Sequence, residues 1–243
     1  MNLIKLDAID STNDFLKRLN QAGPVKNWTV VMAESQLSGK GQMGAQWMSE
    51  KGKNLTMSIL VNDLELEPTE IFTLNVAVSL AIIKVLQNFQ IPRLSIKWPN
   101  DIMSDNKKIG GILIENIFKS NKQITSIIGI GLNVNQKNFE NLPQANSISL
   151  IKKQDFEKEI ILKQIFDSIQ MFFLKFNSPE IVNMWNNYNT NLFKKGMPMP
   201  FEISDEKPFM AIIHQVKQNG TLVLKLEDDS FKTFKVKEIK MLY

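Results

Sequence analysis

The chain has 243 residues, 43% of them hydrophobic, which is enough for a sizeable core and excludes a disordered tail or a disulfide scaffold. It contains no cysteine and one histidine, His214, which excludes thiol nucleophiles, cysteine-ligated metals and multi-histidine metal sites. The 29 basic and 25 acidic residues give a net charge of +4, and the basic residues are scattered, whereas a nucleic-acid-binding surface requires them clustered.

The first half of the chain alternates strand and helix signals. Residues 3–9 predict a strand, and Ser11-Thr12 offer hydroxyl caps to a helix that ends at Gly23-Pro24. Further strands are predicted at 28–33, 55–61 and 94–98, a buried helix from Pro68 to about Phe89, and a polar, glycine-bearing loop at 34–54. We expect residues 36–54 to order on ligand binding.

The second half is predicted to contain a hairpin, two helices and a set of short strands. Residues 109–118 and 124–134 predict adjacent antiparallel strands around a turn at 119–122, buried on both faces because they are continuously apolar. Helices are predicted at 156–176 and 179–188. After Gly196, short strands are predicted at 200–203, 210–217, 221–226 and 231–236, separated by turn signals such as Ser204-Asp205. This predicts a domain of residues 1–194 and a small β domain of residues 195–243.

Targeting signals are not evident in the sequence. Asp7 and Asp10 lie in a first segment without an apolar run, which is unlike a signal peptide. The most apolar stretch, 71–86, is interrupted by polar residues and is shorter than the roughly 18–20 residues that span a bilayer. We therefore expect a cytoplasmic protein with no membrane partner.

A glycine-rich segment, Gly39-Lys40-Gly41-Gln42-Met43-Gly44, matches the dinucleotide-binding pattern G-x-G-x-x-G. It begins six residues after the predicted strand, and the segment after it is too short and glycine-broken for the helix that a dinucleotide-binding unit requires. The glycines instead permit positive φ and leave backbone N–H groups to converge on an anion, with Lys40 adding charge and Trp47 an apolar surface. The alternative is a flexible surface loop.

Three later segments also combine chemistry-bearing residues. In Lys97-Trp98-Pro99-Asn100-Asp101 a strand end delivers charged and amide groups into one loop, or simply forms a turn. In 107–115, two consecutive glycines mark a close approach, and Lys108 beside them can neutralise a ligand carboxylate; a β-bulge with a solvated lysine is the alternative. In 128–135, Asn133 either holds a base or ribose or caps the strand. His214 is interpreted as structural.

Taken in order, these segments resemble the biotin protein ligases. The resemblance rests on six motifs: Asp10-Ser11-Thr12-Asn13, Glu34-Ser35-Gln36, GKGQMG followed by Trp47, KWPND at 97–101, KKIGGILIE at 107–115 and GLNVN at 131–135. The motifs cover the chain from Asp10 to about Asn135, and from there to Tyr243 the resemblance rests only on the predicted order of helices and strands.

The resemblance implies an α+β fold, with a mixed, largely antiparallel sheet and flanking helices, similar to class II aminoacyl-tRNA synthetases, plus an SH3-like β-barrel. It implies that biotin is activated by ATP, with Mg²⁺, as biotinyl-5′-AMP. The biotinyl group then passes to a lysine of a biotin carboxyl carrier protein domain of a carboxylase.

The resemblance also implies roles for individual residues. Catalytic roles are expected for Lys108, Lys40 and Asp101, the last in orienting or deprotonating the incoming amine. Biotin contacts are expected from Ser11, Thr12, Asn13, Gln36, Gly39, Lys40, Gly41, Gln42, Trp47, Lys108 and Gly111. Adenylate contacts are expected from Lys40, Gln42, Trp47, Asn100, Asn133 and Lys108. No metal ligands are assigned.

Two departures from the family pattern carry expectations of their own. The family's arginines, often at the positions of Lys40, Gln42 and Ala45, are absent here, so we expect weaker retention of the adenylate. The motifs begin almost with the chain, so we expect a short form without the helix-turn-helix domain of some bacterial relatives and without operator binding. The sequence leaves monomer and homodimer open.

Two rival interpretations remain. A lipoate or octanoate ligase or transferase shares the fold, although the KWPND loop and the polar residues Ser11, Thr12 and Gln36 favour a ureido ring. A basic nucleic-acid-binding module would account for the isoelectric point near 9.1, but the lysines are scattered.

Overall fold

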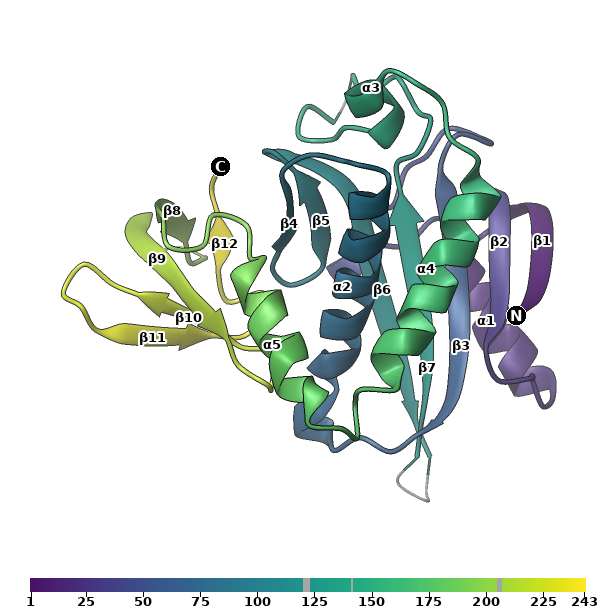
Figure 1. Cartoon of the computed structure of the whole chain (residues 1–243), viewed down its shortest axis with the longest axis horizontal. Helices are drawn as coiled ribbons and strands as arrows, with labels where there is room; N and C mark the ends of the chain where they lie inside the picture. The colour runs from purple at the N-terminus through teal and green to yellow at the C-terminus, as the bar shows by residue number, and fades with distance from the viewer. Residues whose placement is uncertain (120–122, 141, 205–206) are drawn as a thin grey trace.

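The computed structural model describes residues 1–119, 123–140, 142–204 and 207–243, so the turns predicted at 119–122 and 204–205 lie partly outside the described residues. A seven-stranded sheet forms the centre of the molecule in the order β1-β2-β3-β7-β6-β5-β4 (Figure 1). Its strands are β1 (Asn2–Ile9), β2 (Thr29–Gln36), β3 (Leu55–Leu64), β4 (Leu94–Lys97), β5 (Asp101–Ser104), β6 (Lys107–Phe118) and β7 (Ile124–Leu132). Only β1 and β2 pair in parallel, which confirms the mixed, largely antiparallel sheet.

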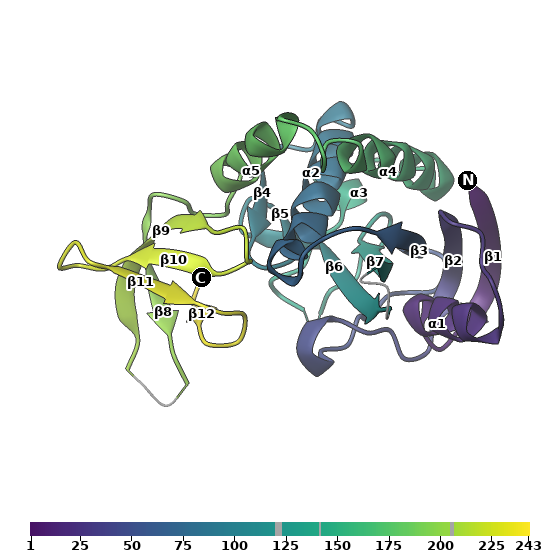
Figure 2. The same ribbon diagram turned by 90° about the horizontal axis from the view of Figure 1, so that it is seen from below.

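Helices cover both faces of this sheet unequally. The helices α2 (Phe72–Asn88), α4 (Lys158–Phe173) and α5 (Glu180–Thr190) lie on one face, and α1 (Thr12–Ala22) lies on the other (Figure 2). The short α3 (Ile148–Lys152) and the 3-10 turns η1 (Gln42–Gly44) and η2 (Pro68–Glu70) complete the helical elements of the described residues. The face that α1 leaves open is therefore available for a site.

The apolar helix predicted from Pro68 is the core of the larger domain. Residues 68–88 are long and apolar enough to cross a membrane by length and composition, but 72% of the apolar window is buried inside the protein. The helix packs on α4, α5 and the strands β4 to β6. The burial predicted from the sequence is confirmed, and it identifies a core helix.

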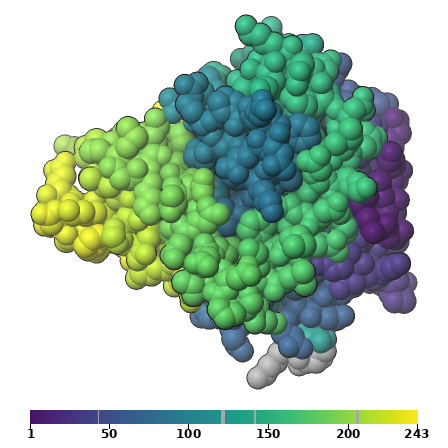
Figure 3. Space-filling view, viewed as in Figure 1, coloured from purple at the N-terminus to yellow at the C-terminus, as the bar shows by residue number. Residues whose placement is uncertain are grey.

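The C-terminal region forms a second, five-stranded sheet in the order β11-β10-β9-β8-β12. Its strands are β8 (Pro198–Glu202), β9 (Phe209–Val216), β10 (Leu222–Lys225), β11 (Phe231–Phe234) and β12 (Lys240–Met241). Figure 3 shows this region as a yellow-green lobe at one end of the molecule. The Trp98 indole N–H donates to the Gly220 carbonyl at 2.9 Å and ties the two sheets together.

Several elements differ from the sequence prediction. Asp101 was expected in a loop and residues 102–104 were assigned no element, but residues 101–104 form β5, because Ile102 and Met103 are fully buried behind the turn that Pro99 and Asn100 introduce. The helix α3 and the strand β12 were not predicted. Burial on both faces holds for β7 but not for β6, where Gly111 and Leu113 line a cavity and stay partly exposed.

Candidate active site

A cavity of about 340 Å³ lies on the α1 side of the large sheet, and residues of the small domain also line it. Twelve of the residues predicted for the site line it: Ser11, Thr12, Asn13, Gln36, Lys40, Gly41, Gln42, Trp47, Asn100, Asp101, Lys108 and Gly111. Gly39 and Asn133 do not line it. These residues come from five of the six motifs, and Gly131 of the sixth also lines the cavity.

Glycines of β6 and β7 form the floor of this cavity. A Cβ atom on Gly131 would lie 2.4 Å from the Trp47 ring, and one on Gly111 would lie 3.4 Å from Lys108 and 3.5 Å from Trp47. A Cβ on Gly129 would lie 2.5 Å from Asn13 Oδ1. Asn13 and Trp47 therefore need glycine at 129 and 131, whereas at Gly111, where the sequence predicted a close approach, the contacts are ordinary van der Waals distances.

A β-bulge turns Lys108 into the cavity. Asp101 pairs with Gly111 and Ile102 with Gly110, but Met103 pairs with Lys108, so Ile109 is the additional residue. An inserted residue reverses the alternation of side chains, which moves Lys108 to the face that Asp101 and Gly111 share. The alternative of a bulge was correct, but Lys108 is ion-paired rather than solvated: its Nζ lies 2.6 Å from Asp101 Oδ1.

A second lysine, Lys97, shares this carboxylate. Its Nζ lies 3.9 Å from Asp101 Oδ2 and 4.7 Å from the centre of the Tyr243 ring, and its side chain is 21% exposed. Burial lowers the pKa of Lys97, opposed by Asp101 and reinforced by the positive charges of Lys108 and Lys240. Two lysines, Lys97 and Lys108, thus share one carboxylate, and the excess of positive charge suits an anionic ligand.

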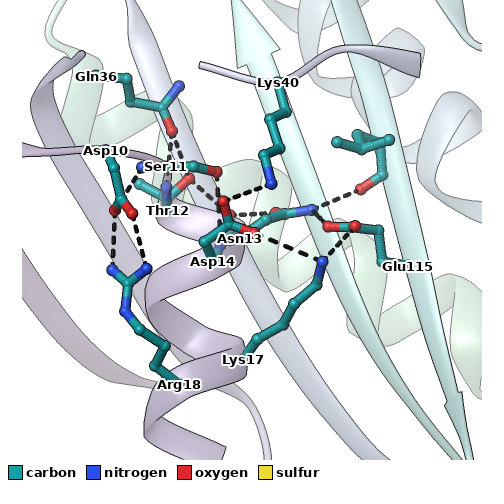
Figure 4. Close-up of polar contacts among 12 residues, drawn as sticks. Asp10, Ser11, Thr12, Asn13, Asp14, Lys17, Arg18, Gln36, Lys40 and Glu115 are labelled. Carbon is teal, nitrogen blue, oxygen red and sulfur yellow. Dashed lines mark hydrogen bonds and ion pairs between the residues drawn. The ribbon is translucent and has the colours of Figure 1, made fainter. Parts of the chain in front are cut away.

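The other predicted cation, Lys40, lines the same cavity but is held by Asp14. The Lys40 Nζ lies 2.7 Å from Asp14 Oδ2, and this contact raises the pKa of Lys40 (Figure 4). Lys40 and Lys108 therefore face one cavity, and each has a carboxylate of the protein as its partner.

Polar side chains of α1, β2 and β3 form one wall. Ser11 is the N-cap of α1, and Gln36 Oε1 accepts from the Thr12 N–H at 2.8 Å and from its hydroxyl at 3.0 Å. Ser58 Oγ lies 2.7 Å from Thr12 Oγ1 and 2.6 Å from Asn13 Oδ1. Ser11, Thr12, Asn13 and Gln36 form a polar wall of the cavity, and the buried Ser58 fixes Thr12 and Asn13 from behind.

The glycine loop, residues 37–50, has a different backbone from the one predicted. Of its glycines only Gly44 has a positive φ, +83°. The N–H groups of Gly41, Ala45 and Trp47 donate to carbonyls within the loop, at 2.7, 3.1 and 2.8 Å. The prediction of free amides converging on an anion, which was made for residues 39–44, is wrong for Gly41, because the loop closes on itself as a tight turn around η1.

The two asparagines expected to contact the adenylate lie in different places. Asn100 lines the cavity, and its Nδ2 donates to the Ile112 carbonyl at 2.7 Å. Asn133 is buried away from the cavity and donates to the Asn146 carbonyl at 3.0 Å, holding the segment before α3. Gly39 lies where the arms of the loop cross, with a position for Cβ only 2.4 Å from the Trp47 carbonyl oxygen.

The small domain supplies cavity residues that sequence reasoning missed. Lys237 and Lys240 line the cavity together with the apolar side chains of Phe201, Ile213, Leu222 and Ile239. These positions follow the last recognisable motif, and no local signal distinguishes their lysines from the exposed Lys232 of β11. His214 is exposed on β9 against the Phe231 ring, away from the cavity.

Among the described residues no cluster of three or more histidine or acidic side chains is arranged to hold a metal ion. Among the described residues, Asp101 is the one acidic residue that lines the cavity. The described residues therefore offer one carboxylate to a metal ion in this cavity, and that carboxylate is already paired with Lys108.

Comparisons with known proteins identify relatives of the chain. The sequence profile of the biotin/lipoate A/B protein ligase family matches residues 6–133. The biotin--[acetyl-CoA-carboxylase] ligase of Mycobacterium tuberculosis is 30% identical over 219 residues, which cover 88% of this chain and 79% of that protein. The bifunctional ligase/repressor BirA of Escherichia coli is 33% identical over 135 residues, and the match spans 41% of its length.

The solved structures agree with the sequence comparison. The biotin protein ligase from Aquifex aeolicus, in complex with biotin and ATP, has a TM-score of 0.82 at 25% identity, covering 99% of this chain and 98% of that one. The predicted α+β fold with a small C-terminal β domain is confirmed. The chain belongs to the biotin/lipoate A/B protein ligase family, and within that family it is similar to the biotin protein ligases.

Proposed function

We propose that this chain is an ATP-dependent ligase that activates biotin as biotinyl-5′-AMP and transfers it to a lysine of a biotin carboxyl carrier protein domain. The observation that carries the proposal is the shared cavity, where Lys40 and Lys108 lie beside a polar wall from Thr12 and Gln36. Family membership and the biotin and ATP named for the Aquifex aeolicus structure support it.

The first step brings two anions together. A carboxylate oxygen of biotin forms a bond to the α-phosphorus of ATP, and the bond to pyrophosphate breaks. Lys108 would neutralise the carboxylate, and Lys40 would face the phosphates, so that both approach without repulsion. Lys108 must exchange the Asp101 carboxylate for that of biotin, whereas the Lys40 ammonium can face the phosphates while one of its N–H groups stays paired with Asp14.

The ureido ring of biotin is neutral and polar, so it needs hydrogen-bond partners when it is buried. Ser11, Thr12 and Gln36 would provide them, while Trp47 and the glycine floor would contact the apolar part of the bicycle. Trp47 Nε1 is buried without a hydrogen-bond partner among the described residues. A buried indole N–H usually has an acceptor, which a ligand can supply.

In the second step the acceptor amine attacks the mixed anhydride, an N–C bond forms, and AMP leaves. The acceptor lysine must first lose a proton, and Asp101 would orient it or take that proton. Mg²⁺ would neutralise phosphate charge and would be held mainly by the substrate phosphates.

The acceptor, compartment and assembly belong to the same proposal. We expect a carrier domain of a carboxylase as the partner, a cytoplasmic location, and either a monomer or a homodimer. We expect no operator binding, which a titration with DNA at increasing salt would test.

Pyrophosphate exchange with ATP plus biotin, lipoate or octanoate, measured in parallel, tests the activity. We expect exchange with biotin alone and, on adding a carrier domain, a mass increase at one lysine. Exchange with lipoate or octanoate instead would favour the rival ligase. The relatives named above are biotin ligases and do not favour that rival.

A further inference from the structure

The glycine loop, residues 37–50, carries one basic residue, Lys40, where the family resemblance led us to expect several arginines. The loop is anchored at its start by the N–H groups of Leu37 and Ser38, which donate to the carbonyls of Ile9 and Asp10, each at 2.9 Å. At its far end, the Glu50 N–H donates to Gln136 Oε1 at 3.1 Å. These contacts fix the two ends of the loop but not its middle segment.

Two side chains fasten that middle segment in the described part of the chain. Trp47 lies against Gly131 of the floor, and Lys40 reaches α1, where its Nζ is 2.7 Å from Asp14 Oδ2. The remaining hydrogen bonds of the segment, such as Gly41 N–H to the Ala45 carbonyl, stay within the loop. The Lys40–Asp14 pair is thus the ionic contact that fixes the loop on the α1 side of the cavity.

Asp14 is itself held by a network that starts in the wall of the cavity. Lys17 lies 3.6 Å from Asp14 Oδ1 and also contacts Glu115 Oε1, and Glu115 Oε2 accepts from Asn13 Nδ2 at 2.7 Å (Figure 4). Asn13 in turn contacts Ser58, which contacts Thr12. A continuous chain of polar contacts therefore connects the polar wall with the Asp14 carboxylate, which pairs with Lys40 of the loop.

We propose that Asp14 is a positioning residue that holds the glycine loop across the cavity through its ion pair with Lys40. It acts on the reaction through Lys40. The inference deepens the proposed function, because a closed loop retains the adenylate where the usual arginine at Gln42 is absent.

The pair is of moderate strength. Asp14 is 20% exposed and Lys40 50%, so solvent screens the attraction only in part. Partly exposed ion pairs shift an equilibrium by about two- to fivefold. The loop is expected to open that much more often once the pair is removed.

Ligand-free protein gives the first test. Lys40 is the single trypsin site between residues 37 and 50, so cutting after it reports on this loop. Asp14→Asn should raise the rate of that cut about two- to fivefold. Hydrogen exchange at residues 41–47 should rise by a similar factor in Asp14→Asn and in Lys40→Gln, which removes the pair from the other side.

Two matched variants make the test specific. Asp14→Glu keeps the carboxylate and should stay near the parent rate. Glu159→Gln removes the carboxylate of the Lys5–Glu159 pair, whose atoms are 3.1 Å apart, and should leave the loop unchanged. Unchanged exchange in both Asp14→Asn and Lys40→Gln, or an equal rise in Glu159→Gln, would overturn the proposal.

The enzyme assay separates positioning from general damage. In Asp14→Asn, release of the adenylate should quicken about two- to fivefold, while the maximal rate of pyrophosphate exchange stays within about twofold. A fall in the maximal exchange rate by the same factor as the rise in the release rate would contradict a positioning role. Absence of exchange with biotin in the parent protein would overturn the proposed function, whereas the ligand-free results judge the loop contact by themselves.

Discussion

The carboxylate of Asp101 lies 2.6 Å from the ammonium of Lys108, so the carboxylate and the cation with the central roles in the proposed reaction neutralise each other in the absence of substrate. Their contact depends on the β-bulge at Ile109, which brings Lys108 to the cavity face of β6. Lys97 Nζ lies 3.9 Å from the other oxygen of the same carboxylate, Oδ2. Substrate binding must therefore rearrange an existing ion pair.

Replacing Lys108 should abolish most of the adenylation step. Lys108→Gln keeps a polar side chain of similar size but removes the charge that faces the biotin carboxylate. Loss of one such group costs about 10²–10³ in rate, so pyrophosphate exchange should fall by that factor. Lys107→Gln is the matched control, because the neighbouring side chain is exposed and contacts the Pro143 carbonyl; its rate should stay within about twofold. A Lys108→Gln rate within about tenfold of the parent would contradict the role.

Replacing Asp101 should affect transfer more than activation. Asp101→Asn keeps the shape of the side chain but can no longer accept a proton. With preformed biotinyl-5′-AMP, transfer to a carrier domain should slow by about 10²-fold or more. Pyrophosphate exchange should change less, because Lys108 keeps its charge. The hypothesis fails if transfer proceeds at the parent rate while exchange is also normal.

Adding one methyl group to the floor should displace Trp47. A Cβ on Gly131 would lie 2.4 Å from the indole, so Gly131→Ala must move the ring or the strand. Overpacking of this kind costs about 1–3 kcal/mol, measurable by urea unfolding, and tryptophan fluorescence should change. Gly23→Ala is the control: no atom lies within 4 Å of its Cβ position, so stability should change by less than about 0.5 kcal/mol. Equal unfolding midpoints for the two variants would contradict the packing argument.

Gly111 of the cavity floor could be predicted from sequence because its signal is local, whereas the approach of Asn13 and Trp47 to Gly129 and Gly131 was not predicted. Consecutive glycines in an apolar strand, as at Gly110-Gly111, weaken a strand unless something must come close, and Lys108 stands beside them. The cap at Ser11 and the core helix likewise follow from hydroxyl and apolar patterns within a few residues. Such features depend on neighbours in the chain.

Features that depend on contacts between distant segments could not be predicted. Lys40 can pair with Asp14 only because the loop and α1 meet in the folded protein, and nothing in the sequence around either residue indicates the other as its partner. Lining of the cavity by Lys237 and Lys240 depends on how the small domain docks. The strand β5 was missed because the turn signals of Pro99 and Asn100 obscure a four-residue strand that the sheet buries.

The ion pair between Asp10 and Arg18 should make the free energy of unfolding depend on pH. Two contacts of 2.7 and 2.9 Å to the guanidinium, with help from the Ser11 N–H, lower the pKa of Asp10 from 3.8 to about 2. A lowered carboxyl pKa stabilises the fold above the unfolded pKa, and the gain is lost as pH falls from 3.8 toward about 2.

Urea unfolding of the parent and of Asp10→Asn checks this linkage. The parent should be the more stable protein near pH 5, and the difference should shrink progressively as the pH is lowered toward about 3. Both groups are largely exposed, so high salt should also reduce the difference. A difference that is independent of pH would show that the ion pair is not its source.

Restoring a positive charge at Gln42 should slow the escape of the adenylate. Gln42 lines the cavity and is neutral where the family usually carries an arginine, so the intermediate lacks one charged contact. A hydrogen bond to a charged group contributes about 1.5–3 kcal/mol, and Gln42→Arg should therefore lower the release rate of biotinyl-5′-AMP about tenfold or more. Gln87→Arg adds the same charge on the exposed side of α2 and should leave release unchanged. Release that is equal in Gln42→Arg and the parent, measured by filter binding under the same salt, would show that the neutral residue does not limit retention.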